Sequence, residues 1–276
     1  MTDFIVKDKL FNNSYISNYH SVIRLNGNFF SKSFYCPKSK KIIYYQKGEI
    51  IDNKPLIETN KQHLQKEIIL IDTQYNTLTP TAFHFYEKQN NLLKFVYGEN
   101  FNETYTDTLF FDSIQVIYAI DGKIQTHINK IDKKLLRSTF SIILDSFLSL
   151  YKTSDFKSSI LTATFDNYFY LFLISNNKLL LANTLKYKNI DDILYHNLNL
   201  YDKFTLDKKE TAFYFLNLSQ LFENQEIKKT LNIFGIKNNK ILLSPPKDAI
   251  GYKFHSIEID DLFLHYKTYT IENNRR

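Results

Sequence analysis

Runs of apolar and aromatic residues separated by short polar turns occur twice in the chain, about 140 positions apart. Each stretch predicts three consecutive strands, joined first by a two-residue turn and then by a three-residue turn. The predicted strands are residues 21–25, 28–36 and 40–46 in the first stretch and residues 159–165, 168–174 and 178–187 in the second. This repeated three-strand pattern predicts two halves of similar structure.

The two-residue turns have sequences that favour tight hairpins. Asn26-Gly27 is the strongest short hairpin signal, because both central residues of a type I′ turn need positive φ. Asp166-Asn167 is a weaker version of the same signal. We therefore expect a type I′ turn at each of these positions.

Apolar residues that recur at spacings of three and four predict helices between the strands. Residues 136–151 give the clearest helical pattern, and Asp132 is its expected N-cap. Further helices are predicted to start at Thr79-Pro80, at Asn189 and at Ser219, the last of them ending at Gly235.

The remaining apolar segments predict strands, so helices and strands alternate after each meander. These strands are residues 67–72, 110–120, 123–128, 211–218, 240–243 and 254–259, with a hairpin turn at Asp121-Gly122. The polar tail beyond Ile271 is expected to fray. An α/β protein with mixed sheets follows from this order of elements.

Net charge does not indicate an acidic partner, although the chain carries +6. Residues 1–155 contain 19 Lys and Arg against 16 Asp and Glu, and residues 156–276 contain 16 against 13, so each half carries +3. Arg24, Arg137, Arg275 and Arg276 are the only arginines, whereas bidentate phosphate and base recognition favours arginine over lysine. We therefore expect a solvated lysine surface and no nucleic-acid partner.

Cysteine content and hydropathy predict a cytoplasmic protein. Cys36 is the single cysteine, so it forms no intramolecular disulfide, and we expect it to be a buried residue at a strand end. Residues 1–10 lack the apolar core of a secretory signal, and the longest apolar runs are shorter than the ~20 residues that cross a bilayer. Membrane insertion is therefore not expected.

Histidines and acids near the C-terminus do not predict a metal site. The group consists of His255, Glu258, Asp260, Asp261 and His265. On the strand predicted there, His255 and Glu258 point to opposite faces, which prevents chelation. We predict no metal site in the chain.

Three segments of the second half resemble a known family. They are Lys178-Leu-Leu-Leu-Ala-Asn-Thr, Ile190-Asp-Asp-Ile-Leu-Tyr and Phe213-Tyr-Phe-Leu. They look like the pattern of an uncharacterised bacterial domain-of-unknown-function family that is similar in fold to actin-like ATPases, the group of actin, sugar kinases and heat-shock chaperones. The resemblance covers nearly the whole chain. It implies two duplicated RNase-H-like lobes, which we place at residues 15–152 and 153–272.

Active members of the actin-like fold carry an Asp-x-Gly-like sequence in the first turn of each half and paired glycines at a later strand-to-helix junction. Here the first turn, Asn26-Gly27, keeps a glycine and lacks the acid, and the second turn, Asp166-Asn167, keeps an acid and lacks the glycine. The junction that ends at Ser219 has no glycine. These five residues are candidates for a vestigial cofactor site, and no bound cofactor and no catalytic residue are expected.

Three hypotheses about function remain open from the sequence. The first is a non-catalytic protein-binding or scaffolding module with an unknown protein partner. The second is a divergent nucleotide-binding ATPase or kinase-like enzyme that uses Asp166. The third is a lysine-driven binder of nucleic acid or of a membrane surface, whose affinity would fall steeply with salt.

Overall fold

The computed structural model describes residues 4–50, 66–82, 89–109, 113–128, 131–218, 224–236, 239–241, 245–250, 254 and 259–274. Within the chain there are two compact units. The first comprises Met1–Ile143, Pro245–Glu258 and Leu262–Arg276, and the second comprises Leu144–Ser244 and Ile259–Asp261. The lobe limits at 15–152 and 153–272 stay a prediction.

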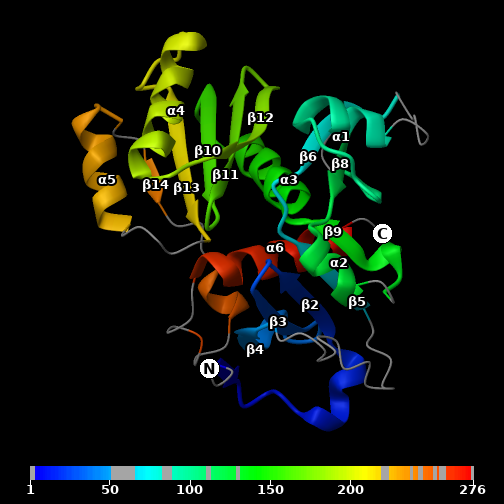
Figure 1. Cartoon of the computed structure of the whole chain (residues 1–276). Helices are drawn as coiled ribbons and strands as arrows, with labels where there is room; N and C mark the ends of the chain where they lie inside the picture. The colour runs from blue at the N-terminus through cyan, green and yellow to red at the C-terminus, as the bar shows by residue number, and fades with distance from the viewer. Residues whose placement is uncertain are drawn as a thin grey trace. The chain divides into compact units, whose positions relative to one another are not determined.

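A mixed sheet of six described strands forms the centre of the first unit, in the order β1-β4-β3-β2-β5-β9 (Figure 1). The strands are β1 (Phe4–Lys7), β2 (His20–Leu25), β3 (Phe29–Cys36), β4 (Lys41–Glu49), β5 (Lys66–Ile71) and β9 (Leu136–Ser138). The pairs from β1 to β2 are antiparallel, whereas β5 runs parallel to both β2 and β9. All six residues of β2 are buried, as expected for a central strand.

One face of this sheet packs against the C-terminal helix α6 (Ile259–Asn274), whose residues from Leu262 onward belong to the first unit. The imidazole of His265 is fully buried, with Nε2 2.9 Å from Ser31 Oγ and Nδ1 2.7 Å from Ser33 Oγ. The Tyr269 hydroxyl lies 2.8 Å from Ser33 Oγ and donates to the Ser33 carbonyl. Polar groups of β3 are thereby satisfied inside the core. The opposite face carries an aromatic cluster around Tyr19, Phe34 and Tyr44.

A smaller antiparallel sheet is inserted in the first unit between β5 and β9, in the order β6-β8-β7. Its strands are β6 (Asn76–Pro80), β7 (Thr104–Thr108) and β8 (Ile114–Ala119), and helix α1 (Gln89–Tyr97) packs on it through Leu93. The rings of Tyr75, Tyr97 and Phe101 contact one another beside Leu93. Helix α2 (Gly122–Ile128) and the short 3₁₀ helix η3 (Lys133–Leu135) lead back to β9.

The second unit contains a mixed sheet of five described strands, in the order β12-β11-β10-β13-β14. The strands are β10 (Ser158–Thr164), β11 (Tyr168–Ser175), β12 (Lys178–Lys186), β13 (Thr211–Asn217) and β14 (Asn239–Ile241). Helices α4 (Ile190–Lys203) and α5 (Asn224–Ile233) pack on one face (Figure 1), through a core that includes Ile193 and Leu231. On the other face Phe147, from α3 (Thr139–Lys152), contacts the rings of Phe172 and Tyr214.

Apart from the additional edge strand β1 in the first unit, the sheets of the two units share strand order and direction, and their parallel ladders end in a similar register. In each, three strands pair antiparallel and the first strand of the meander then pairs parallel with a later strand. The last pair of this parallel ladder is Leu25 with Ile71 in the first unit and Thr164 with Asn217 in the second. These sheets confirm the predicted α/β fold with mixed sheets and flanking helices.

The predicted type I′ turns at Asn26-Gly27 and Asp166-Asn167 are wrong. Asn26, Asp166 and Asn167 have no positive φ, and neither does Gly27. Positive φ occurs instead at Asn176 (49°) and Asn177 (61°), so the β11–β12 hairpin has the backbone that a type I′ turn requires. Local side-chain hydrogen bonds set the backbone at the first turn and override the preference of the Asn-Gly pair.

Several element predictions in the first half are also wrong. Thr79 and Pro80 end strand β6, because this segment pairs with β8. The predicted strand at 123–128 is helix α2, with Ile124 and Ile128 buried one turn apart. Asp132 caps η3 before strand β9, and α3 begins only at Thr139.

Near the C-terminus, residues 255–258 of the predicted strand at 254–259 lie outside the described residues, and Ile259 begins helix α6. The helix continues to Asn274, and Ile271 and Glu272 are buried, so the predicted fraying beyond Ile271 is wrong for these residues. Cys36 is half-buried at the end of β3, not fully buried as expected.

Replacing Ser33 tests the buried network between β3 and α6. We expect Ser33→Ala to reduce the free energy of unfolding by about 1–3 kcal/mol, because His265 and Tyr269 both lose a partner in the core. Ser21→Ala on the neighbouring strand is the matched control. Its buried hydroxyl has no hydrogen-bond partner among the described residues, so its loss should be neutral or slightly stabilising. Urea unfolding measures both, and equal losses would contradict the network.

The helix cap at Asn189, predicted from the sequence, is present and can be tested separately. Asn189 Oδ1 accepts from the Asp192 amide at 3.1 Å. Asn189→Ala should therefore cost about 1 kcal/mol of unfolding free energy, whereas Asn189→Ser should retain most of it. Urea denaturation of the three proteins gives the comparison, and identical midpoints for all of them would show that the cap adds no stability.

Candidate functional site

The first hairpin turn joins β2 to β3 at Asn26 and Gly27. The Asn26 amide donates to the Phe29 carbonyl at 3.0 Å and closes the hairpin. The side-chain carbonyl of Asn26 accepts from the Asn28 amide at 3.1 Å and from the Phe29 amide at 2.7 Å. Two backbone N–H groups at the tip are therefore already bonded to the chain itself and do not point to an external anion.

A buried ion pair lies where the parallel strands β2 and β5 end. Arg24 Nε lies 3.1 and 3.0 Å from the two carboxylate oxygens of Asp72, and Arg24 Nη2 donates to Oδ2 at 2.7 Å. Thr139 Oγ1 donates to Asp72 Oδ1 at 2.6 Å. Asp72 is 6% exposed and Arg24 is 8% exposed, so this carboxylate is held by the protein and not by solvent.

A polar network continues from this ion pair toward the inserted sheet. The Ser138 amide donates to Asp107 Oδ2 at 2.7 Å, and the Ser138 hydroxyl donates to Asn76 Oδ1 at 2.7 Å. Burial disfavours the charged form of Arg137, but the nearby carboxylates of Asp107 and Glu272 outweigh it and raise the pKa of Arg137 above its usual value. These groups link the main sheet of the first unit to its insert.

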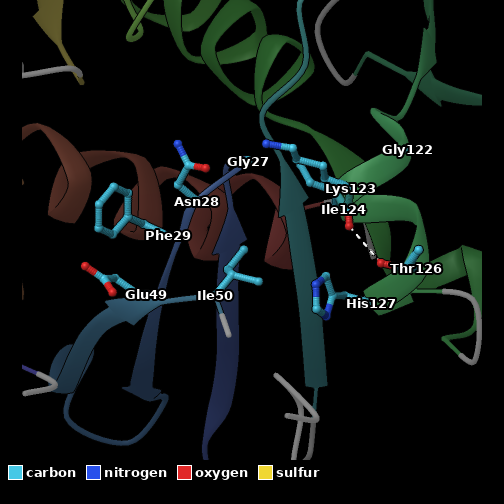
Figure 2. Close-up of a pocket in the computed structure, with 10 residues that line it drawn as sticks. All are labelled: Gly27, Asn28, Phe29, Glu49, Ile50, Gly122, Lys123, Ile124, Thr126 and His127. Carbon is cyan, nitrogen blue, oxygen red and sulfur yellow. Dashed lines mark hydrogen bonds between the residues drawn. The ribbon is translucent and has the colours of Figure 1, made fainter. Parts of the chain in front are cut away.

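Beside the first hairpin the structure contains a cavity of about 690 Å³ (Figure 2). It is lined by Gly27, Asn28, Phe29, Glu49, Ile50, Gly122, Lys123, Ile124, Thr126 and His127. Figure 2 shows the Lys123 side chain extending from α2 toward the hairpin, with the Phe29 ring and the Glu49 carboxylate on the opposite side from His127. All lining residues belong to the first unit, and the volume is typical of small-molecule sites.

The second hairpin turn joins β10 to β11, and both Asp166 and Asn167 are exposed. The Phe165 amide donates to the Tyr168 carbonyl at 2.9 Å, and the two rings stack with centroids 4.7 Å apart. The Tyr187 hydroxyl donates to the Phe165 carbonyl. Aromatic packing thus stabilises the base of this turn, while its polar tip faces solvent.

The structure gives different outcomes for the five residues predicted to form a vestigial cofactor site. Gly27 lines the cavity, and Asn26 shapes the adjacent turn. Asp166 and Asn167 belong to the second unit, and Ser219 lies outside the described residues. Whether any of the five binds a cofactor stays a prediction.

Sequence reasoning missed Arg24, Asp72 and the two α2 residues Lys123 and His127. A usable signal existed for the ion pair, since Asp72 is the last residue of one predicted strand and Arg24 lies near the end of another. No such signal existed for the α2 pair, because residues 123–128 were expected to form a strand. In a strand, two residues spaced by four lie about 13 Å apart along the chain, too far for their side chains to form one site.

Of the C-terminal group expected not to bind metal, residues 255–258 lie outside the description, and Asp260, Asp261 and His265 are on α6. In the part of the chain that is described, no three His, Cys, Asp or Glu side chains are placed to hold a metal ion. No helix in that part is long and apolar enough to cross a membrane.

Solved structures of similar fold identify the architecture. A Bacteroides thetaiotaomicron protein described as having an actin-like ATPase fold and unknown function has a TM-score of 0.71 at 15% identity, covering 93% of this chain and 99% of that one. The PilM-PilN type IV pilus biogenesis complex gives a TM-score of 0.53 at 10% identity, covering 91% and 98%. At these identities the similarity shows the fold alone, which is that of the actin-like ATPases.

A search of curated proteins finds no match. A family described as "protein of unknown function (DUF3822)" matches residues 8–234, which is most of the chain. The resemblance seen in the second half of the sequence is thereby confirmed. The chain belongs to the DUF3822 family and has an actin-like ATPase fold.

Proposed function

We propose that this chain is a protein-binding or scaffolding module that has kept the actin-like fold for its surfaces and does not hydrolyse nucleotides. The observation that carries the proposal is the first hairpin turn, where Asn26 accepts hydrogen bonds from the Asn28 and Phe29 amides. A phosphate cradle needs such amides free to point at phosphate oxygens. The turn also has no acid to position Mg²⁺.

Asp72 gives independent support. Asp72 directly follows strand β5 of the main sheet of the first unit. Its carboxylate accepts hydrogen bonds from Arg24 and Thr139. A metal ion would have to displace a buried guanidinium to reach it, and removing one partner of a buried pair costs about 3–5 kcal/mol.

The PilM-PilN structure supports the proposal by analogy only. It is a complex, and its similarity to this chain extends to the fold. A protein partner for this chain is therefore compatible with an architecture that elsewhere assembles with another protein. The identity of the partner and the expected cytoplasmic location stay predictions.

The alternative is a divergent nucleotide-binding ATPase or kinase-like enzyme. Asp166 favours it, because its carboxylate is exposed at a hairpin tip and has no hydrogen-bond or ion-pair partner in the described part of the chain. An exposed acid at such a position is free to meet a metal-bound ligand.

Calorimetry with ATP and Mg²⁺, combined with a phosphate-release assay, separates the two functions. We expect no micromolar binding and no phosphate release above the protein-free rate, because the first turn offers no free amide pair. The Asp166→Ala variant should behave like the wild type in both assays. Micromolar binding together with phosphate release, both lost in Asp166→Ala, would overturn the proposal and favour the enzyme.

A double-mutant cycle tests whether Asp72 is structural. Arg24→Met should lower the free energy of unfolding by about 3–5 kcal/mol, because it leaves a buried carboxylate without its cation. The double variant Arg24→Met/Asp72→Leu should recover most of that loss, since hydrophobic replacement of a buried pair is often neutral.

Urea unfolding with and without millimolar Mg²⁺ is the measurement for this cycle. Mg²⁺ should leave the stability of Arg24→Met unchanged if Asp72 has no part in metal binding. Rescue of Arg24→Met by Mg²⁺ would contradict a purely structural role and favour a metal site at the end of β5.

A further inference from the structure

The cavity beside the first hairpin has chemistry that the proposed function does not use. Its volume of about 690 Å³ lies within the range of about 300–1,000 Å³ typical of small-molecule sites. Its walls combine an apolar part, made by Phe29, Ile50 and Ile124, with ionisable groups from β4 and α2. This mixture can bury an apolar body and orient it through a small number of polar contacts.

The basic groups of the cavity come from one face of α2. Lys123 and His127 are four residues apart on this helix, so their side chains lie one above the other. The Lys123 ammonium has no ion-pair or hydrogen-bond partner among the residues that the structure describes. It extends toward the hairpin in Figure 2 and is therefore available to an anionic group in the cavity.

The opposite side limits the ligand to a single anionic group. The Glu49 carboxylate lines the cavity and, like Lys123, has no partner in the described part of the chain. A second negative group on that side of the cavity would lie near Glu49, where like charges repel. The hairpin amides cannot compensate, because those of Asn28 and Phe29 are bonded to Asn26. A polyphosphate is thus disfavoured.

We propose that this cavity binds a small molecule in which one anionic group, held by Lys123, is attached to a flat apolar body that packs on Phe29. The ring of Phe29 offers a face for stacking, and aromatic pairs prefer such offset contacts. The buried side chain of Ile124 closes the apolar wall from the side of α2. This inference does not rest on the proposed function and holds with or without a protein partner.

Gly27 allows the cavity to be blocked without strain. A Cβ atom built at Gly27 meets nothing within 4 Å, and its φ lies outside the positive range. A larger side chain at this position is therefore compatible with the hairpin backbone and would enter the space that a ligand needs. Gly27→Phe is a steric test that leaves the charged groups of the cavity in place.

Binding of 2-naphthoate to the full chain tests the inference, with its neutral amide 2-naphthamide and with ATP as comparisons. Because the chain contains no tryptophan, naphthyl fluorescence can be followed with little protein background. We expect saturable 1:1 binding of 2-naphthoate, with affinity at least about tenfold higher than that of 2-naphthamide. ATP should bind more weakly than 2-naphthoate.

Variants then place the binding in this cavity. Lys123→Glu should weaken 2-naphthoate by about tenfold or more, and Gly27→Phe should abolish its binding. Lys94→Glu is the matched control, since Lys94 is an exposed lysine of the same unit that does not line the cavity, and it should change nothing. Circular dichroism and thermal unfolding verify that each variant is folded.

Each of four results would overturn the inference. The first is no saturable binding of 2-naphthoate, and the second is equal affinity for 2-naphthoate and its amide. The third is an unchanged affinity in Lys123→Glu, which would assign the probe to another surface. Tighter binding of ATP than of 2-naphthoate would show a polyphosphate site instead. If Gly27→Phe fails to fold, the comparison of Lys123→Glu with Lys94→Glu still tests whether 2-naphthoate binds in this cavity.

Discussion

The buried pair of Arg24 and Asp72 ties together three elements of the first unit. It connects a strand of the meander to the parallel strand beside it, and Thr139 brings the start of α3 to the same carboxylate. Charges this buried are stable only when geometry and hydrogen bonds compensate for lost hydration. The strand ends and the helix start are therefore fixed together, and the hairpin and the cavity lie beside this fixed point.

The end of the parallel ladder in the second unit uses different chemistry for a similar backbone geometry. There the parallel ladder ends with Thr164 Oγ1 donating to Asn217 Oδ1 at 3.1 Å, without any charge. Neutral hydrogen bonds at this position avoid the hydration cost of an ion pair. A shared strand order thus does not require shared residues at the ends of the strands, where a ligand of this fold class would bind.

The sequence predicted a segment's secondary structure correctly where residues within the segment determine it, and less well where a distant pairing partner does. The two meanders, α4 and its Asn189 cap, and strand β13 follow from patterns within the segment itself, and they were found. Segment 76–80 becomes a strand because β8 pairs with it, and residues 123–128 become a helix whose isoleucines are buried one turn apart. A hydrophobic pattern that covers only six or seven residues cannot distinguish a helix from a strand. The candidate site was missed for the same reason, because Lys123 and His127, which share a face in a strand too, come close together only when one helical turn separates them.

The first unit is discontinuous in the chain, since its sheet begins near the N-terminus and one face is covered by α6 from Leu262 onward. During synthesis on the ribosome the strands of this sheet emerge long before the helix that satisfies Ser31 and Ser33. The second unit lies almost entirely in residues 144–244 and can complete its sheet while the C-terminal helix is still being made. The order of translation therefore leaves the face of the first sheet that α6 covers open until the end of synthesis, and an open sheet face of this kind is prone to aggregation.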